Sequence, residues 1–300
     1  MKPPAFDYHA PDSVAGVLEV LAQYGDDAKP LAGGQSLVPA MSFRLARPSV
    51  LVDLGRVPGL EGIRSEGGEL RFGAMTRQRE LEASALVAER LPLLSGVLPH
   101  IAHPQIRNRG TVGGSLAHAD PAAELPAVLL ALGGRCRIRS SAGERWVGAD
   151  DFYTGLFETA LGDGDLLVEV ALPEEQPRSG WGFHEFARRH GDYALVGVVA
   201  QVHLDGRRLR DGRIALLSVG DGPVRAVRAE QVLRGLDLDD PAARDRGLAE
   251  AARLTAHADI DPPGDLQATA AFRRHLAEVL TRRALDDAVA RALGELAPAT

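Results

Sequence analysis

Two short glycine-containing segments carry the residue types and spacing that suggest chemistry. The first is AGGQS at residues 32–36, and the second is TVGGS at residues 111–115. Both are predicted to enter a helix, where the first amides lack partners within the helix and carry partial positive charge. Glycine removes the Cβ atoms that would hold a ligand away from those amides. The pair therefore predicts two main-chain donor loops for a ligand with two phosphates.

Other interpretations of these segments stay open at this stage. For the first segment alone, a tight turn into a capped helix explains the glycines equally well, with Ser36 as cap or donor. Neither segment matches G-x-G-x-x-G or G-x-x-x-x-G-K-[ST], so a Rossmann NAD site and a P-loop are not supported. Asp120 suits a helix N-cap before Pro121, and Glu124 suits either the first turn of that helix or a contact with a ligand hydroxyl.

The side chains with catalytic potential form no recognised constellation. Ser36 and Ser115 lie in no G-x-S-x-G motif. His100, His103 and His118 do not have the spacing of H-E-x-x-H. The sequence therefore predicts neither a catalytic residue nor a metal ligand in this chain.

Composition excludes several classes of protein. The one cysteine, Cys136, can form no disulfide within the chain and supplies too few ligands for an iron–sulfur cluster or a Cys-rich zinc site. Its strand-like context, GRCRIRS, favours a buried thiol. The formal charge of −7 argues against a general nucleic-acid binder. We expect a cytoplasmic chain without an integral membrane segment, because it shows no secretory signal and no apolar run that spans a bilayer.

The elements that must position the two segments follow from hydrophobic spacing. Strands at 29–32 and 50–54, joined by a helix at 37–45, predict a compact βαβ unit. A hairpin, several helices and further strands follow. The Pro-rich and charged stretch at 173–182 predicts a domain boundary near residue 178. Beyond it we expect an antiparallel sheet and amphipathic helices, the last of which places its arginines in solvent.

Three longer motifs carry a resemblance to a known family. They are PLAGGQSLVPAM, IRNRGTVGGSLAHADPAAELPAVLLAL and FARRHGDYALVGVVA, in this order along the chain. Together they resemble the FAD-binding medium subunit of the molybdenum hydroxylases, the family of aerobic carbon monoxide dehydrogenase and xanthine dehydrogenase. The likeness covers essentially the whole chain.

The resemblance implies an α+β fold of two domains. The first is an FAD-binding domain of the vanillyl-alcohol-oxidase (PCMH) type at residues 1–177, made of two α/β subdomains at about 1–55 and 56–177. The second is a small domain at 178–300 with a three-stranded antiparallel sheet and helices.

The resemblance also implies a set of cofactor-binding residues. Those expected along the FAD pyrophosphate are Ala32, Gly33, Gly34, Gln35, Ser36 and the adjoining Leu37, and those that close its other side are Thr111, Gly113, Gly114 and Ser115. Asp120 and Glu124 join the set, and Glu124 stands where relatives often carry an aspartate facing the ribityl or adenosine part. Leu167 is expected near the flavin ring through its backbone. His184 stands where xanthine-type relatives have a lysine. Tyr193 matches the aromatic residue that covers one face of the ring, or else is a tyrosine of the domain core.

The implied function is that of an oxidoreductase subunit. Substrate is oxidised at a molybdopterin cofactor on a separate large subunit, and electrons reach FAD through two [2Fe–2S] clusters on a separate small subunit before they pass to an external acceptor. The expected assembly is a dimer of heterotrimers. Two alternatives remain: a free-standing flavoprotein oxidase of the same cofactor fold, and a flavin-free scaffold or sensor. The sequence leaves the substrate and the acceptor open.

Overall fold

A three-stranded parallel sheet begins the fold in the computed structural model, which describes residues 2–296. Its strands, in the order β1-β3-β2, are β1 (Asp7–His9), β2 (Ala28–Leu31) and β3 (Val50–Asp53). Helix α1 (Val14–Tyr24) starts at Ser13, whose hydroxyl accepts a hydrogen bond from the Gly16 amide at 3.2 Å, and it ends at Gly25. Helix α2 (Leu37–Ser42) links the parallel strands β2 and β3. The predicted βαβ unit is confirmed, with a shorter helix.

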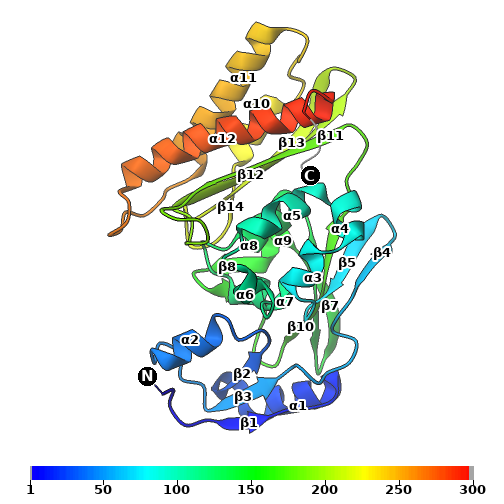
Figure 1. Cartoon of the computed structure of the whole chain (residues 1–300), viewed down its shortest axis with the longest axis vertical. Helices are drawn as coiled ribbons and strands as arrows, with labels where there is room; N and C mark the ends of the chain where they lie inside the picture. The colour runs from blue at the N-terminus through cyan, green and yellow to red at the C-terminus, as the bar shows by residue number, and fades with distance from the viewer. Residues whose placement is uncertain (1, 297–300) are drawn as a thin grey trace.

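A five-stranded antiparallel sheet forms the middle of the molecule (Figure 1). Its order is β4-β5-β10-β6-β7, from β4 (Ile63–Glu66), β5 (Glu69–Gly73), β6 (Arg135–Ser140), β7 (Gly143–Gly148) and β10 (Leu166–Pro173). The helices of this unit are α3 (Gln78–Glu82), α4 (Ala85–Arg90), α5 (Pro92–Val97), α6 (Pro104–Arg107), α7 (Val112–His118), α8 (Glu124–Ala131) and α9 (Ala149–Phe152). A small hairpin joins β8 (Tyr153–Gly155) to β9 (Glu158–Thr159). Cys136 is buried in β6, as predicted, and burial raises the pKa of its thiol to about 12.

The C-terminal part is a third sheet covered by helices. Its antiparallel strands, in chain order, are β11 (Ser179–Phe186), β12 (Val196–Asp205), β13 (Arg208–Leu217) and β14 (Val224–Arg225). The three long strands correspond to the expected sheet, and β14 adds a short fourth strand. The helices are α10 (Val227–Leu233), α11 (Pro241–Leu254), which ends in a π-turn at Thr255–Asp259, and α12 (Ala270–Leu293). Helix α12 lies along the face of this sheet (Figure 1).

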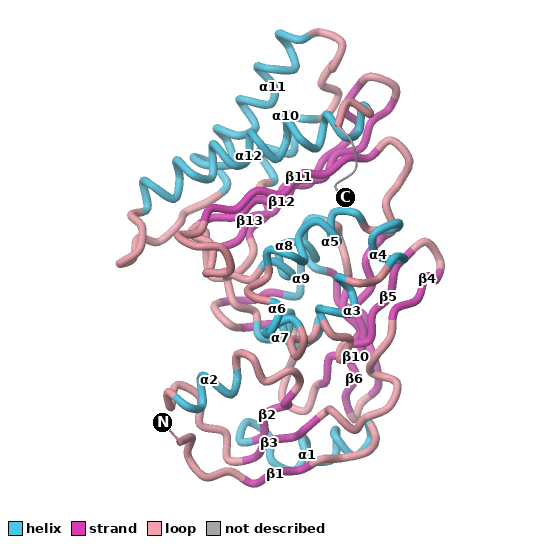
Figure 2. The backbone as a smooth tube through the Cα atoms, in the orientation of Figure 1, coloured by secondary structure: helices cyan, strands magenta, loops and turns pink. Residues whose placement is uncertain are grey.

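Helix α8 joins the middle sheet to the C-terminal sheet. Figure 2 shows the three sheets stacked along the molecule, with α8 between the upper two. All eight residues of α8 are buried, and its side chains pack on the middle sheet and on β12 and β13. A helix that is apolar on all sides is stable only when it is covered on all sides. The two units therefore share a hydrophobic cluster around α8, while the other face of the C-terminal sheet forms a second core with α10, α11 and α12.

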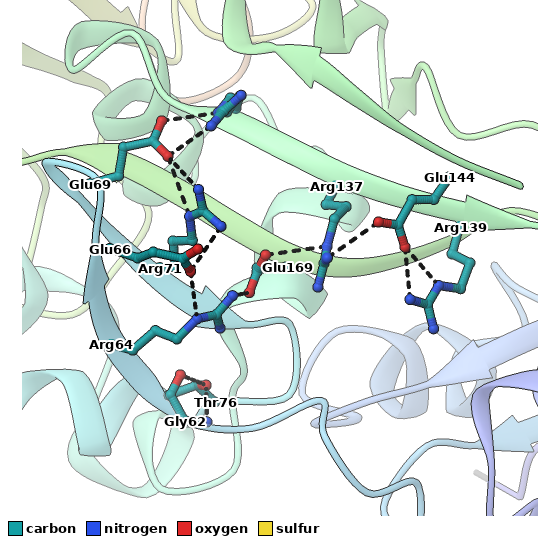
Figure 3. A network of polar contacts seen from close by, with 11 residues as sticks. Gly62, Arg64, Glu66, Glu69, Arg71, Thr76, Arg137, Arg139, Glu144 and Glu169 are labelled. Carbon is teal, nitrogen blue, oxygen red and sulfur yellow. Dashed lines mark hydrogen bonds and ion pairs between the residues drawn. The ribbon is translucent and has the colours of Figure 1, made fainter.

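Alternating arginines and glutamates cover the outer face of the middle sheet (Figure 3). Glu169 of β10 is only 2% exposed and lies between Arg64 and Arg137, with its carboxylate 3.2 Å from Nε of Arg137. The register of β10 against β6 shifts between Leu167 and Glu169. This bulge directs Val168 into the core of the first subdomain, while Leu167 packs in the core between the middle sheet and its helices. The paired charges thus fix the strand that connects the two subdomains.

Two arginines of α12 depart from the prediction of a solvated face: Arg291, whose side chain is 15% exposed and donates to the carbonyl oxygen of Trp181, and Arg273. Arg273 is 6% exposed and donates to two backbone carbonyls and to Asp265. The expectation was wrong for this residue because the loop before β12 and the turn after β13 both close over it. Among residues 2–296, no helix is both long enough and apolar enough to cross a membrane.

Candidate functional site

The two glycine segments lie against each other. A Cβ atom placed on Gly33 would be 2.3 Å from the carbonyl oxygen of Arg109, just before the second segment. A Cβ atom on Gly114 would be 3.4 Å from Cβ of Ala32 in the first segment. Residues about 80 positions apart in sequence therefore form one wall. The bare backbone of Gly33 permits this contact, since no other residue type fits the space.

The first segment offers a run of free donors. In the part of the chain that the structure describes, the main-chain amides of five consecutive residues donate to no acceptor; these residues are Gly33, Gly34, Gln35, Ser36 and Leu37. Gly34 has φ of +72°, a conformation that favours glycine, and the side-chain amide of Gln35 donates to the Gly33 carbonyl at 2.9 Å. Ser36 precedes α2 but its hydroxyl makes no cap hydrogen bond. Five uncommitted amides in succession suit an anion such as a diphosphate.

The second segment differs from this expectation. The Val112 amide donates to the carbonyl oxygen of Thr76 at 3.0 Å, and the Gly113 amide donates to that of Ala74 at 2.8 Å. The Gly114 amide donates to Oγ1 of Thr111 at 3.0 Å, and the Ser115 amide donates to the Thr111 carbonyl oxygen at 3.1 Å. The prediction that both segments present free amides is therefore wrong for the second. Gly113 serves close packing instead, since a Cβ atom there would be 2.5 Å from Cβ of Ala74. The second segment supports the first and leaves the Ser115 hydroxyl for a ligand.

Asp120 lies in a turn and does not cap the following helix. Its carboxylate accepts from the Ala122 amide at 2.9 Å, while α8 begins only at Glu124. The Tyr193 hydroxyl, from the loop after β11, faces the Asp120 carboxylate, and the pKa of Tyr193 is raised first by partial burial and then by that charge. Tyr193 is 67% exposed, so it does not belong to the domain core. The structure thus brings Asp120 and Tyr193 together from the two domains.

His184 is not brought to these residues. It lies opposite Val198 in the sheet, on the face that packs on α12, and its Nε2 is 3.1 Å from the Asp287 carboxylate. The next residue, Glu185, points to the other face and lies 3.3 Å from Nδ1 of His100. Because successive side chains of a strand point to opposite faces of the sheet, Glu185 and His184 point in opposite directions. The sequence does not tell which of these faces lies against the first domain. For that reason Glu185 was not singled out from the sequence as a residue that faces the first domain.

Leu167 and Glu124 are both buried. The Leu167 side chain is buried in the core between the middle sheet and its helices, so a ligand reaches only its backbone. Glu124 is 8% exposed and makes no hydrogen bond to another side chain of the described residues. Burial raises the pKa of its carboxyl to about 8; its own amide opposes this rise, and the Glu185 and Asp120 charges add to it. Glu124 is therefore largely protonated at neutral pH.

This pKa predicts how stability depends on pH. The contribution of Glu124 to the folding stability is fully present below its unfolded pKa of 4.5. It is lost as the pH rises through its folded pKa of about 8. Between about pH 6 and about pH 9, we expect the wild type to lose on the order of 3 kcal/mol relative to Glu124→Gln. Denaturant unfolding of the apoprotein measures this difference. Glu19→Gln, at an exposed position of α1, is the control, and a pH-independent difference between wild type and Glu124→Gln would refute the assignment.

The donor set fits a dinucleotide with a diphosphate bridge and gives no sign of a metal centre. The free amides lie in the segment that packs against the second glycine segment, and Tyr193 of the second domain faces Asp120 of the first domain. Within residues 2–296, no three His, Cys, Asp or Glu side chains are grouped so that they would hold a metal ion.

Comparison with known proteins identifies the family. Residues 4–175 match the model described as the FAD binding domain in molybdopterin dehydrogenase, and residues 181–288 match the CO dehydrogenase flavoprotein C-terminal domain. The 6-hydroxypseudooxynicotine dehydrogenase complex subunit alpha of Paenarthrobacter nicotinovorans is 44% identical, over 97% of this chain and 97% of its own length. The carbon monoxide dehydrogenase medium chain of Afipia carboxidovorans is 39% identical, over 97% and 99%.

A solved structure agrees with these matches. Carbon monoxide dehydrogenase from Hydrogenophaga pseudoflava contains a chain that superposes with a TM-score of 0.93 at 38% identity, covering 97% of this chain and 99% of that chain. The expected α+β fold and FAD cofactor are confirmed by these comparisons. The chain is therefore an FAD-binding medium subunit of the molybdenum hydroxylase family, to which the carbon monoxide and xanthine dehydrogenases belong.

Proposed function

We propose that the five free amides of residues 33–37 bind the diphosphate of FAD. The observation that carries this proposal is their lack of any acceptor in the described chain, next to two glycines that keep the approach open. The remaining members of the proposed site are Ala32, Thr111, Gly113, Gly114, Ser115, Asp120, Glu124, Leu167 and Tyr193. His184 is left out because it pairs with Asp287 on the far face of the sheet.

Each part of the chain has a distinct task in this proposal. Bound FAD supplies the redox chemistry, while the protein binds, orients and shields it. The first segment holds the diphosphate, and the second segment holds the first in place. Tyr193 covers one face of the ring, and Glu124 places a largely neutral carboxyl beside the site. The domains are residues 1–177, with subdomains at about 1–55 and 56–177, and residues 178–300.

The partners follow from the relatives, which are named as subunits or chains of larger enzymes. We propose that this chain receives electrons from a small subunit with two [2Fe–2S] clusters and passes them to an external acceptor. A large subunit with molybdopterin oxidises the substrate, and the assembly is a dimer of heterotrimers. The single cysteine agrees with this division of tasks, since a cluster needs more thiolates than the chain has. A chain with one cysteine also gains no disulfide from an oxidising compartment, so we place the complex in the cytoplasm.

Cofactor binding is tested by reconstitution. The purified chain, alone and together with its partner subunits, is incubated with FAD and passed through a gel-filtration column. We expect a flavin absorbance band that elutes with the protein. If neither preparation retains flavin, the proposal fails.

A further inference from the structure

Tyr193 and Asp120 come from different domains, so their relative position depends on contacts that join the two segments. Tyr193 lies in the loop between β11 and β12, and Asp120 lies in the turn between α7 and α8. Neither segment has regular secondary structure of its own. Loops of this kind keep a fixed geometry only where hydrogen bonds and packing hold them in place.

One residue is bonded to both segments. Ser218 follows β13, and its amide donates to the carbonyl oxygen of Pro121 at 2.8 Å, next to Asp120. Its hydroxyl donates to the carbonyl oxygen of Ala194 at 2.7 Å, next to Tyr193. Ser218 has φ of +62°, a left-handed conformation that is unfavourable for a residue with a Cβ atom. Such backbone strain persists only where the surroundings enforce it.

A buried arginine locks this arrangement from the side of α12. Nη1 of Arg273 donates to the carbonyl oxygen of Ser218 at 3.0 Å and also to that of Leu195. Its Nη2 lies 2.6 Å from the carboxylate of Asp265, which in turn accepts from the amides of Gln267 and Ala268. Charge-assisted hydrogen bonds to buried carbonyls are stronger and more directional than neutral ones. Ser218 and Arg273 thus contact the Tyr193 loop at two consecutive carbonyls.

We propose that Ser218 and Arg273 form a clamp that sets the position of Tyr193 against the Asp120 turn, so that both are positioning residues for the flavin ring. The inference rests on the proposed role of Tyr193. It assigns a function to two residues that lie outside the glycine segments and touch no part of the proposed diphosphate site. It also explains why Arg273, alone among the charged residues of α12, is buried by more than nine-tenths.

Ser218→Gly is the decisive variant. It deletes the hydroxyl but keeps the amide, and glycine relieves the left-handed backbone, so the fold is retained. In the apoprotein we expect faster hydrogen exchange in residues 187–195, which lose the bond from the hydroxyl, and unchanged exchange in residues 119–123, which keep the bond from the amide of position 218. In the FAD-loaded complex with partner subunits, we expect about tenfold weaker flavin binding and brighter flavin fluorescence, because a displaced tyrosine quenches less. Tyr193→Ala should give the same optical change, and the two substitutions together should add nothing further.

Ser179→Gly is the matched control. The Ser179 hydroxyl donates to the carbonyl of Gln176 at 2.6 Å, at the other end of β11, so the substitution also removes one serine-to-carbonyl bond. It should leave exchange at 187–195 and flavin fluorescence unchanged. Arg273→Lys, which keeps a charged donor, should fall between wild type and Ser218→Gly.

The clamp is refuted if exchange in residues 187–195 stays at the wild-type rate in Ser218→Gly, or if its effect on fluorescence adds in full to that of Tyr193→Ala. These outcomes differ from a failure of the proposed function, in which the wild-type complex itself holds no flavin.

Discussion

Gly33→Ala is expected to abolish detectable FAD binding at concentrations that saturate the wild type. The added methyl group would lie 2.3 Å from the carbonyl oxygen of Arg109 and 3.0 Å from Cα of Gly110. Both are main-chain atoms in a segment fixed by its own hydrogen bonds, so the first segment must move away and its amides lose their alignment. Losing two amide hydrogen bonds to a charged diphosphate, at about 1.5–3 kcal/mol each, weakens binding by at least about 100-fold.

Flavin fluorescence titration measures this change, and circular dichroism checks that the variant is folded. Gly148→Ala is the control, because a methyl group there meets nothing within 4 Å and the backbone φ is negative. Gly34→Ala is informative as well. Its methyl group would meet the movable side chains of Val38 and Leu31 at 3.2 and 3.3 Å, so we expect a smaller loss that comes mainly from the strained φ of +72°. Wild-type affinity in Gly33→Ala would show that the contact between the segments is not needed.

Gly182→Ala is expected to cost about 3 kcal/mol of folding free energy, a large effect for one methyl group. A Cβ atom at Gly182 would be 2.0 Å from the carbonyl oxygen of Ala284 in α12. Gly180 has the same relation to Ala288, also at 2.0 Å. Helix α12 therefore rests directly on the backbone of β11. An added side chain must lift a 24-residue helix from the sheet, since no flexible side chain is there to yield.

Equilibrium denaturation of the full chain tests this prediction. Gly222→Ala in the same domain is the control, because its methyl group would meet only Cβ of Tyr153 at an ordinary 3.7 Å. We expect that control to lie within about 0.5 kcal/mol of the wild type. A Gly182→Ala variant as stable as the control would mean that the helix and the strand separate at little cost.

Short-range patterns in the sequence were enough to predict the individual helices and strands. Ser13 and Gly25 mark the two ends of α1 because a hydroxyl satisfies a free amide and glycine adopts a positive φ, and both effects act within a few residues. The βαβ unit, the burial of Cys136 and the long strands after residue 178 follow from patterns of the same short range. The glycine segments were found in this way too.

What surrounds a segment decides which of its groups are left for a ligand, and that is a tertiary property. The two glycine segments read alike, yet Ala74 and Thr76 take up amides of the second, while those of the first stay free. His184 and Glu185 are adjacent in a strand, and only the packing of α12 shows which of them faces the first domain.

The sequence by itself determined the elements, the family and the cofactor, because capping, periodicity and motif spacing act over a few residues. The contact of Gly33 with Arg109, the burial of Arg273 and the contacts of Ser218 with Pro121 and Ala194 were decided only by the tertiary structure. These contacts join residues from about 20 to almost 100 positions apart. A hydrogen bond between such distant residues depends on how whole sheets and helices pack, and no local pattern records that packing.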